Sequence, residues 1–198
     1  ASEAEIAVVK LKEAKDYLRK FYGIRQKAVC YQETDIMQGL RYLHLLALKS
    51  QKPLVMCVAL GTNLGGHNGM SSLSQILGSY SRLVDRCVVI GGGNEANERH
   101  HFQGQLNQVG EMRVESGNTG FVAELWGTIP NIVTAYLISP SGERSPVISI
   151  RQGSRYQLTF PFEQTVVDVE YRLFLRDGRS QLLFLKFDHP AQGIWKIG

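Results

Sequence analysis

Apolar residues in the first hundred positions gather into short continuous runs. One β-branched run follows the first few residues, and two later runs are apolar throughout. Continuous apolar character is typical of strands that are covered on both faces of a parallel sheet. We therefore expect three strands in this part of the chain, near residues 5–11, 53–60 and 86–91.

Two segments between these runs have helical spacing. In the first, apolar side chains recur every three or four positions, at Ile36, Leu40, Leu43, Leu46 and Ala47. This pattern predicts an amphipathic helix over 34–49 with Thr34 as its N-cap. Residues 71–83 predict a second helix. Strands that alternate with helices indicate a parallel, right-handed α/β layer.

The pattern of apolar and polar residues changes beyond Asn97. Short strand-like runs follow one another without a helical period, at 121–126, 133–138, 166–171 and 182–187. Turn signals rich in Gly, Ser and Pro separate them. Short strands at such spacing favour an antiparallel β-sandwich or jelly roll. The predicted fold class is thus α/β plus all-β, with domains at 1–104 and 105–198.

The charge, hydropathy and cysteine content of the chain indicate which classes of protein are not expected. The 198 residues hold 22 Lys and Arg against 18 Asp and Glu, a formal charge of +4, and the basic residues are scattered. Nucleic-acid binding is not expected, because phosphate contacts need a focused positive surface. A membrane span is not expected either, since no apolar stretch approaches about 18 residues. Cys57 and Cys87 lie inside apolar runs, which predicts buried free thiols.

The segment with the most chemical content is Val88-Val89-Ile90-Gly91-Gly92-Gly93-Asn94-Glu95, an apolar strand that runs into glycines and then an asparagine. Reaction at an acyl carbon needs hydrogen-bond donors aimed at the developing oxyanion. A side-chain amide just past a strand end can be held rigidly in such a place. Glycines beside it allow a substrate backbone to approach closely.

This segment resembles the oxyanion-asparagine motif of the subtilisin-like serine proteases, peptidase family S8. Val58-Ala59-Leu60-Gly61 resembles the family's strand that ends in Ser-Leu-Gly, pairs with substrate and walls the specificity pocket. Residues 4–11 are similar to the strand that follows the catalytic-histidine helix. The three likenesses occur in family order and cover residues 1–97.

Further motifs resemble a clostridial-type branch of the family, which includes the spore germination proteases. They are Gly61-Thr62-Asn63, Gly66-His67-Asn68-Gly69, Gly93-Asn94-Glu95 and His100-His101-Phe102. In that branch a jelly-roll domain is inserted between the oxyanion asparagine and the catalytic serine. The resemblance therefore implies an inserted jelly roll over 105–198, and a parent protein that is spore-associated or secreted in a bacterium.

The resemblance also implies roles for individual residues. Asn94 would be the oxyanion-hole donor, and the substrate-binding walls would be Ala59, Leu60, Gly61, Gly91, Gly92 and Gly93. The family's Gly-Thr-Ser and His-Gly-Thr motifs do not occur in this chain, so the catalytic triad is expected in other parts of the parent, and this segment alone should be inactive. The expected partners are a polypeptide substrate and the rest of the protease chain, with no cofactor or metal.

This sequence departs from the family pattern at several wall positions. Ala59 stands where many members have serine, and Ala96 where glycine is common. Gly91 and Gly92 occupy positions where alanines are common. These departures bear on the shape of the expected pocket.

Other interpretations compete with the protease. Gly91-x-Gly93-x-x-Ala96 fits a dinucleotide-binding fingerprint, but the residues after it lack the period of the helix that this motif opens. His100 and His101 are adjacent, so on an extended segment they point to opposite faces and one metal site cannot take both.

The main alternative is a pseudoprotease or a β-sandwich binding module. Four aromatic residues could then build a ligand face, although strand spacing favours core positions for most of them: Trp126, Tyr136, Phe174 and Trp195.

Overall fold

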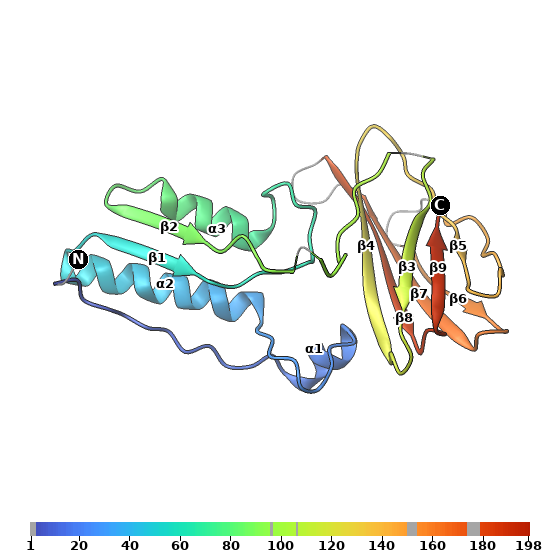
Figure 1. Ribbon diagram of the computed structural model, residues 1–198. Coiled ribbons are helices and arrows are strands. Elements are labelled where there is room, and N and C mark those ends of the chain that lie inside the picture. The colour runs from blue at the N-terminus through green and yellow to red at the C-terminus, as the bar shows by residue number, and fades with distance from the viewer. Residues whose placement is uncertain (1–2, 96, 106, 150–153, 174–178) are drawn as a thin grey trace.

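The computed structural model describes residues 3–95, 97–105, 107–149, 154–173 and 179–198. Figure 1 shows two parts in chain order, helices with a small parallel sheet at one end and antiparallel strands at the other. We refer to them as the α/β part and the two-sheet part. Mixed α/β structure followed by antiparallel sheets agrees with the sequence prediction at this level.

The α/β part contains five elements: α1 (Asp16–Phe21), α2 (Glu33–Ser50), β1 (Leu54–Val58), α3 (Ser72–Ser81) and β2 (Arg86–Ile90). β1 and β2 pair in parallel. A core of Leu40, Met56, Val58 and Leu77 joins α2, β1 and α3. Both long helices therefore cover one face of the sheet, and the two predicted helices and the two later strands are confirmed.

Of the two long helices, only α3 begins with a side-chain cap. α2 begins at Glu33 with Gln32 as its N-cap residue, so the prediction of Thr34 as N-cap is wrong. The Glu33 carboxylate accepts a hydrogen bond from the Leu73 N–H at the start of α3, 2.9 Å away. The Ser71 hydroxyl caps α3 by accepting from Ser74 N at 3.1 Å.

The first predicted strand, near 5–11, is not a strand in the structure. This segment runs alongside α2 without a pairing partner among the described strands (Figure 1). Val9 and Leu11 lie against Gly39 of α2, where an added Cβ would come within 3.1 Å of Val9 Cγ1. Ile6 remains 88% exposed. A β-branched run forms a strand only where a neighbouring backbone can complete its hydrogen bonds.

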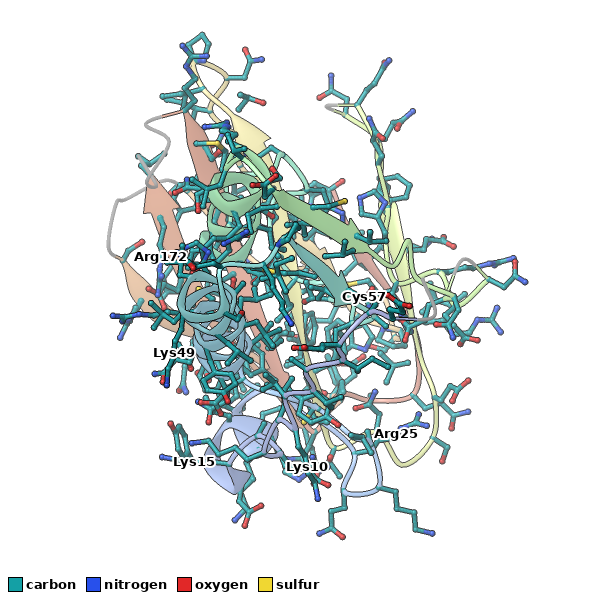
Figure 2. The ribbon with its side chains drawn as sticks, turned by 90° about the vertical axis from the view of Figure 1, so that its left-hand side faces the viewer. Lys10, Lys15, Arg25, Lys49, Cys57 and Arg172 are labelled. Atoms are coloured by element: carbon teal, nitrogen blue, oxygen red, sulfur yellow. The ribbon has the colours of Figure 1, made fainter. Side chains whose placement is uncertain are left out.

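The second face of the β1–β2 sheet is open in the described part of the chain. Val55 is 67% exposed, and Cys57 and Cys87 are exposed free thiols, so the prediction of buried thiols and of coverage on both faces is wrong for this structure. Alternate residues of a strand point to opposite faces. Met56 and Val58 therefore meet the helices, while Val55 and Cys57 point away from them; Figure 2 labels Cys57.

The two-sheet part contains seven strands: β3 (Gly110–Val114), β4 (Gly120–Thr128), β5 (Leu137–Ile138), β6 (Arg155–Phe160), β7 (Thr165–Leu173), β8 (Ser180–Asp188) and β9 (Gly193–Ile197). One sheet has the order β4-β8-β7-β6 and the other β3-β9-β5. All neighbouring strands are antiparallel. The expected strand at 133–138 is shorter than predicted, because only its last two residues pair with β9.

Both sheets share one hydrophobic core. Val114, Leu137 and Trp195 come from the three-stranded sheet, and Phe160, Val169, Leu185 and Phe187 come from the four-stranded sheet. Along β7, residues 165, 167, 169 and 171 are buried and alternate with less buried even-numbered ones. This period of two places one face of each sheet against the other sheet.

Basic side chains are distributed over separate elements. Figure 2 labels Lys10 on the N-terminal segment, Lys49 on α2 and Arg172 on β7. Arg172 is paired with Glu170 at 2.7 Å. Among the described residues, no helix is long and apolar enough to cross a membrane.

Candidate functional site

The carboxyl ends of β1 and β2 lie side by side. Val58 is in register with Ile90, and the Gly91 N–H donates to the Val58 carbonyl at 3.0 Å, which extends the pairing beyond β2. An added Cβ on Gly91 would lie 3.8 Å from the Ala59 Cα. The segments 59–61 and 91–93 thus leave the sheet from one edge, as the parallel-strand prediction requires.

Glycines leave this edge open. A Cβ added at Gly61, Gly92 or Gly93 would meet nothing within 4 Å among the protein atoms. Gly93 alone of these three has a positive φ, +86°, a conformation that side chains other than glycine rarely adopt. Gly61 and Gly92 are therefore not required by internal packing or by φ.

Asn94 follows Gly93 directly. It is exposed, and within the described part of the chain its amide makes no hydrogen bond. Leu60 on the facing segment is exposed as well. An amide N–H at the end of a strand, not committed to a protein acceptor, is available to a bound molecule.

Glu95 is held by two residues on neighbouring loops. Asn63 Nδ2 donates to Glu95 Oε2 at 3.0 Å, and His100 Nδ1 lies 3.2 Å from the same oxygen. Asn63 Nδ2 and His100 Nδ1 are themselves 3.1 Å apart. The hydrogen bond from Asn63, and then that from His100, lower the pKa of Glu95 below its ordinary value. The loop after β1 is thereby joined to the loop after β2.

The Asn63–Glu95–His100 cluster was not assigned by sequence reasoning. The motifs Gly61-Thr62-Asn63 and Gly93-Asn94-Glu95 marked both loops, yet nothing in their spacing places Asn63 against Glu95, 32 positions away. The position of Glu95 next to Asn94 was the one available signal. Contacts between loops depend on the tertiary course of the chain.

The histidine pair behaves as its adjacency predicted. His100 contacts Glu95, whereas the His101 ring lies 4.8 Å from the ring of His67, centroid to centroid. The two side chains therefore face different neighbours. Among the described residues, no group of three or more His, Cys, Asp or Glu side chains could hold a metal ion.

The structure also places the residues behind the two alternative interpretations, the dinucleotide-binding fingerprint and the aromatic ligand face. No helix follows the glycines over the described residues 97–105, as a dinucleotide-binding turn would need, and Ala96 lies outside the described residues. Among the aromatic residues, Trp195 is fully buried in the core and the Tyr136 ring carries the Arg144 guanidinium 3.8 Å from its centroid. Trp126 is exposed on β4, and Phe174 lies outside the described residues.

Comparison with known proteins adds one finding about the fold. No family model matches this chain, and no curated protein matches it. Among solved structures, the chain is similar to the CspB protease of Clostridium perfringens, with a TM-score of 0.77 and 23% sequence identity. The match covers 87% of this chain and 38% of that protease chain. This chain therefore has the fold of a segment of a clostridial protease.

Proposed function

We propose that this chain is a segment of a subtilisin-like serine endopeptidase of the clostridial, jelly-roll-containing type. Residues 1–104 would form part of the catalytic domain, and 105–198 an inserted jelly-roll β-sandwich. The observation that carries the proposal is the meeting of 59–61 and 91–93 at one sheet edge, with Asn94 directly beyond. The fold likeness to the Clostridium perfringens protease supports it.

The geometry suits acyl transfer on a polypeptide. A substrate backbone that runs between Gly61 and Gly92 would meet no Cβ at either position, and the space at each glycine is open. The peptide carbonyl would then lie near Asn94. The asparagine N–H donates more strongly to an oxygen that carries negative charge, so it stabilises the tetrahedral intermediate more than the bound substrate.

The nucleophile and its base belong to other parts of the proposed parent. This chain spans 38% of the protease chain that it resembles, which leaves room there for the serine, histidine and aspartate. A free oxyanion donor cannot start acyl transfer without them. The substrate walls and Asn94 would act on a polypeptide that the remaining protease chain also contacts.

The test is covalent labelling of the complete parent protein by a fluorophosphonate, which phosphonylates activated serines with loss of fluoride. We expect labelling that is lost when the serine of the parent's Gly-Thr-Ser motif is replaced by alanine, together with hydrolysis of peptide substrates. A parent that is neither labelled nor active on peptides would be a pseudoprotease, or a carrier for a β-sandwich binding module, and the proposal would be wrong.

A further inference from the structure

The loop that follows the proposed substrate wall is bonded to the two-sheet part. Residues 61–70 lead from the wall toward α3, and the Gly65 N–H donates to Glu124 Oε2 on β4 at 2.8 Å. The same oxygen accepts the indole N–H of Trp126 at 2.9 Å. A single carboxylate oxygen thus holds both the loop backbone and a neighbouring aromatic ring.

Packing adds a second restraint at this junction. An added Cβ on Gly66 would lie 3.0 Å from Trp126 Cε3 and 3.2 Å from its Cδ2, so only glycine lets the loop come this close to the ring. Asn68 Nδ2 also donates to Ser180 Oγ on β8 at 3.4 Å. In the β4–β8 register Glu124 lies opposite Phe184 and Trp126 opposite Leu182.

These contacts lie on the outer face of the four-stranded sheet. The residues that alternate with Glu124 and Trp126 along β4, namely Phe121, Ala123 and Leu125, pack on the core between the sheets. Glu124 and Trp126 therefore point away from that core and toward the loop. The same face meets α1, where the ring of Phe21 stacks on Phe184 with centroids 6.0 Å apart.

A hollow accompanies the loop at this face. A cavity of about 480 Å³ lies among Gly66, Asn68, Met70, Trp126, Thr128 and Ser180. The loop thus borders open space as well as the Trp126 ring. Besides the Asn63–Glu95 bond and the His67–His101 ring contact, the loop is held to the two-sheet part by the bonds of Gly65 to Glu124 and of Asn68 to Ser180, of which the bond to Glu124 is the shorter.

We propose that Glu124 is a positioning residue for the substrate wall at 59–61, which rests on the function proposed above. The wall is fixed at one end by the hydrogen bond between Gly91 and Val58, and beyond its other end the loop is held by Asn63 on Glu95 and by Gly65 on Glu124. Gly61 and Gly65 give the intervening backbone wide conformational freedom. The anchor on the two-sheet part restricts that freedom on the side that Asn63 does not hold, and it keeps the wall in its substrate-binding place.

The experiment is Glu124→Ala in the complete parent, read out by amide hydrogen exchange and by kinetics. Exchange over residues 61–66 should become faster, because the Gly65 N–H loses its acceptor. KM for a peptide should rise about 10-fold with kcat nearly unchanged, since a displaced wall weakens substrate and transition state alike. Glu124→Gln keeps an acceptor oxygen for Gly65 and should restore most of the protection.

Glu111→Ala is the matched control. Glu111 lies on β3 of the other sheet and pairs with Lys196 at 3.5 Å, away from the loop. It should leave both exchange and KM unchanged. If Glu124→Ala does not fold, Gly66→Ala displaces the same loop by pressing a Cβ against Trp126.

Three outcomes overturn the proposal. They are unchanged exchange over 61–66 in the Glu124 variant, an equal effect of Glu111→Ala, and faster exchange without a rise in KM. A parent that hydrolyses no peptide refutes the proposed function separately, and the exchange comparison then decides alone whether Glu124 positions the loop.

Discussion

Asn94 occupies a position set by its two neighbours. Gly93 turns the chain with a φ of +86°, and Glu95 is held by Asn63 and His100. The asparagine between them is exposed. A side chain in this setting can be oriented by backbone and loop contacts while its own amide stays free for a substrate.

The first prediction at the scale of single residues concerns Asn94 itself. In the complete parent, Asn94→Ala should lower kcat by about 100- to 1,000-fold, or about 3–4 kcal/mol, the range known from removal of such a donor in the subtilisin-like family. KM should be nearly unchanged, because the donor acts mainly on the charged intermediate. Asn94→Asp should be at least as harmful, since a carboxylate repels the oxyanion. Steady-state kinetics of the two variants measure kcat and KM separately. A defect confined to KM would mean that Asn94 only shapes the loop.

A second residue-scale prediction concerns the carboxyl group of Glu95. Its pKa lies below the ordinary value of 4.5, first because Asn63 donates to it and then because of His100. Since the folded-state pKa is depressed, the stabilisation is present above about pH 4.5 and is lost as the pH falls through the depressed value. Asn63→Ala should move the pKa of Glu95 up toward 4.5, as an NMR titration of the carboxyl carbon would show.

Asn68→Ala provides the control for this titration. Asn68 belongs to the same loop but donates to Ser180 rather than to Glu95. It should leave the Glu95 titration in place. An identical Glu95 pKa in wild type and in Asn63→Ala would show that the cluster does not hold the carboxylate in solution.

At the scale of elements, burial distinguishes side chains of the same type. Phe187 on β8 is 1% exposed, and its ring lies 4.5 Å from that of Phe121 and 5.3 Å from that of Trp195. Phe162, in the turn between β6 and β7, is 84% exposed. These two phenylalanines differ in what their removal would leave behind, because only one of them fills space between the sheets.

Replacement of these residues gives an element-scale prediction. Phe187→Ala should lower the free energy of unfolding of the two-sheet part by about 3–5 kcal/mol, since it removes apolar contacts and leaves a cavity. Phe162→Ala should change it by no more than about 0.5 kcal/mol. Urea denaturation of the complete parent, followed at residues of the two-sheet part, measures both. Equal losses for the two variants would contradict the assigned core.

At the scale of the whole molecule, the two parts contribute different things to the proposed function. The α/β part supplies the sheet edge from which 59–61 and 91–93 emerge, and the two-sheet part holds the loop after that edge through Glu124. The chain corresponds to 38% of the protease chain that it resembles. Under the proposed function, catalysis also needs the Gly-Thr-Ser and His-Gly-Thr motifs, which do not occur in this sequence.

This division predicts the behaviour of the isolated chain. The 198-residue segment should not react with a fluorophosphonate, because no Gly-Thr-Ser or His-Gly-Thr segment is present in its sequence. Gel-based detection of the labelled protein, with the complete parent run beside it, makes the comparison. Labelling of the segment would show that it holds an activated serine of its own.

The sequence by itself determined the two long helices and the paired strands of the α/β part, and with them the sheet edge at which the candidate site lies. Helical spacing predicted α2 and α3, and continuous apolar runs that end in glycine predicted β1 and β2. These signals are local, so they survive without knowledge of the fold. The rule that parallel strands present their carboxyl ends at one edge then brought Gly61 and Gly93 to the same side.

Only the tertiary structure decided what each apolar or polar side chain meets. The 5–11 run has strand character, yet it lies on α2 because no described strand offers it a backbone partner. Cys57 has an apolar neighbourhood in sequence and an exposed position in space. The bond of Glu124 to Gly65 joins residues 59 positions apart. Such contacts depend on the path of the whole chain, which a local sequence pattern does not predict.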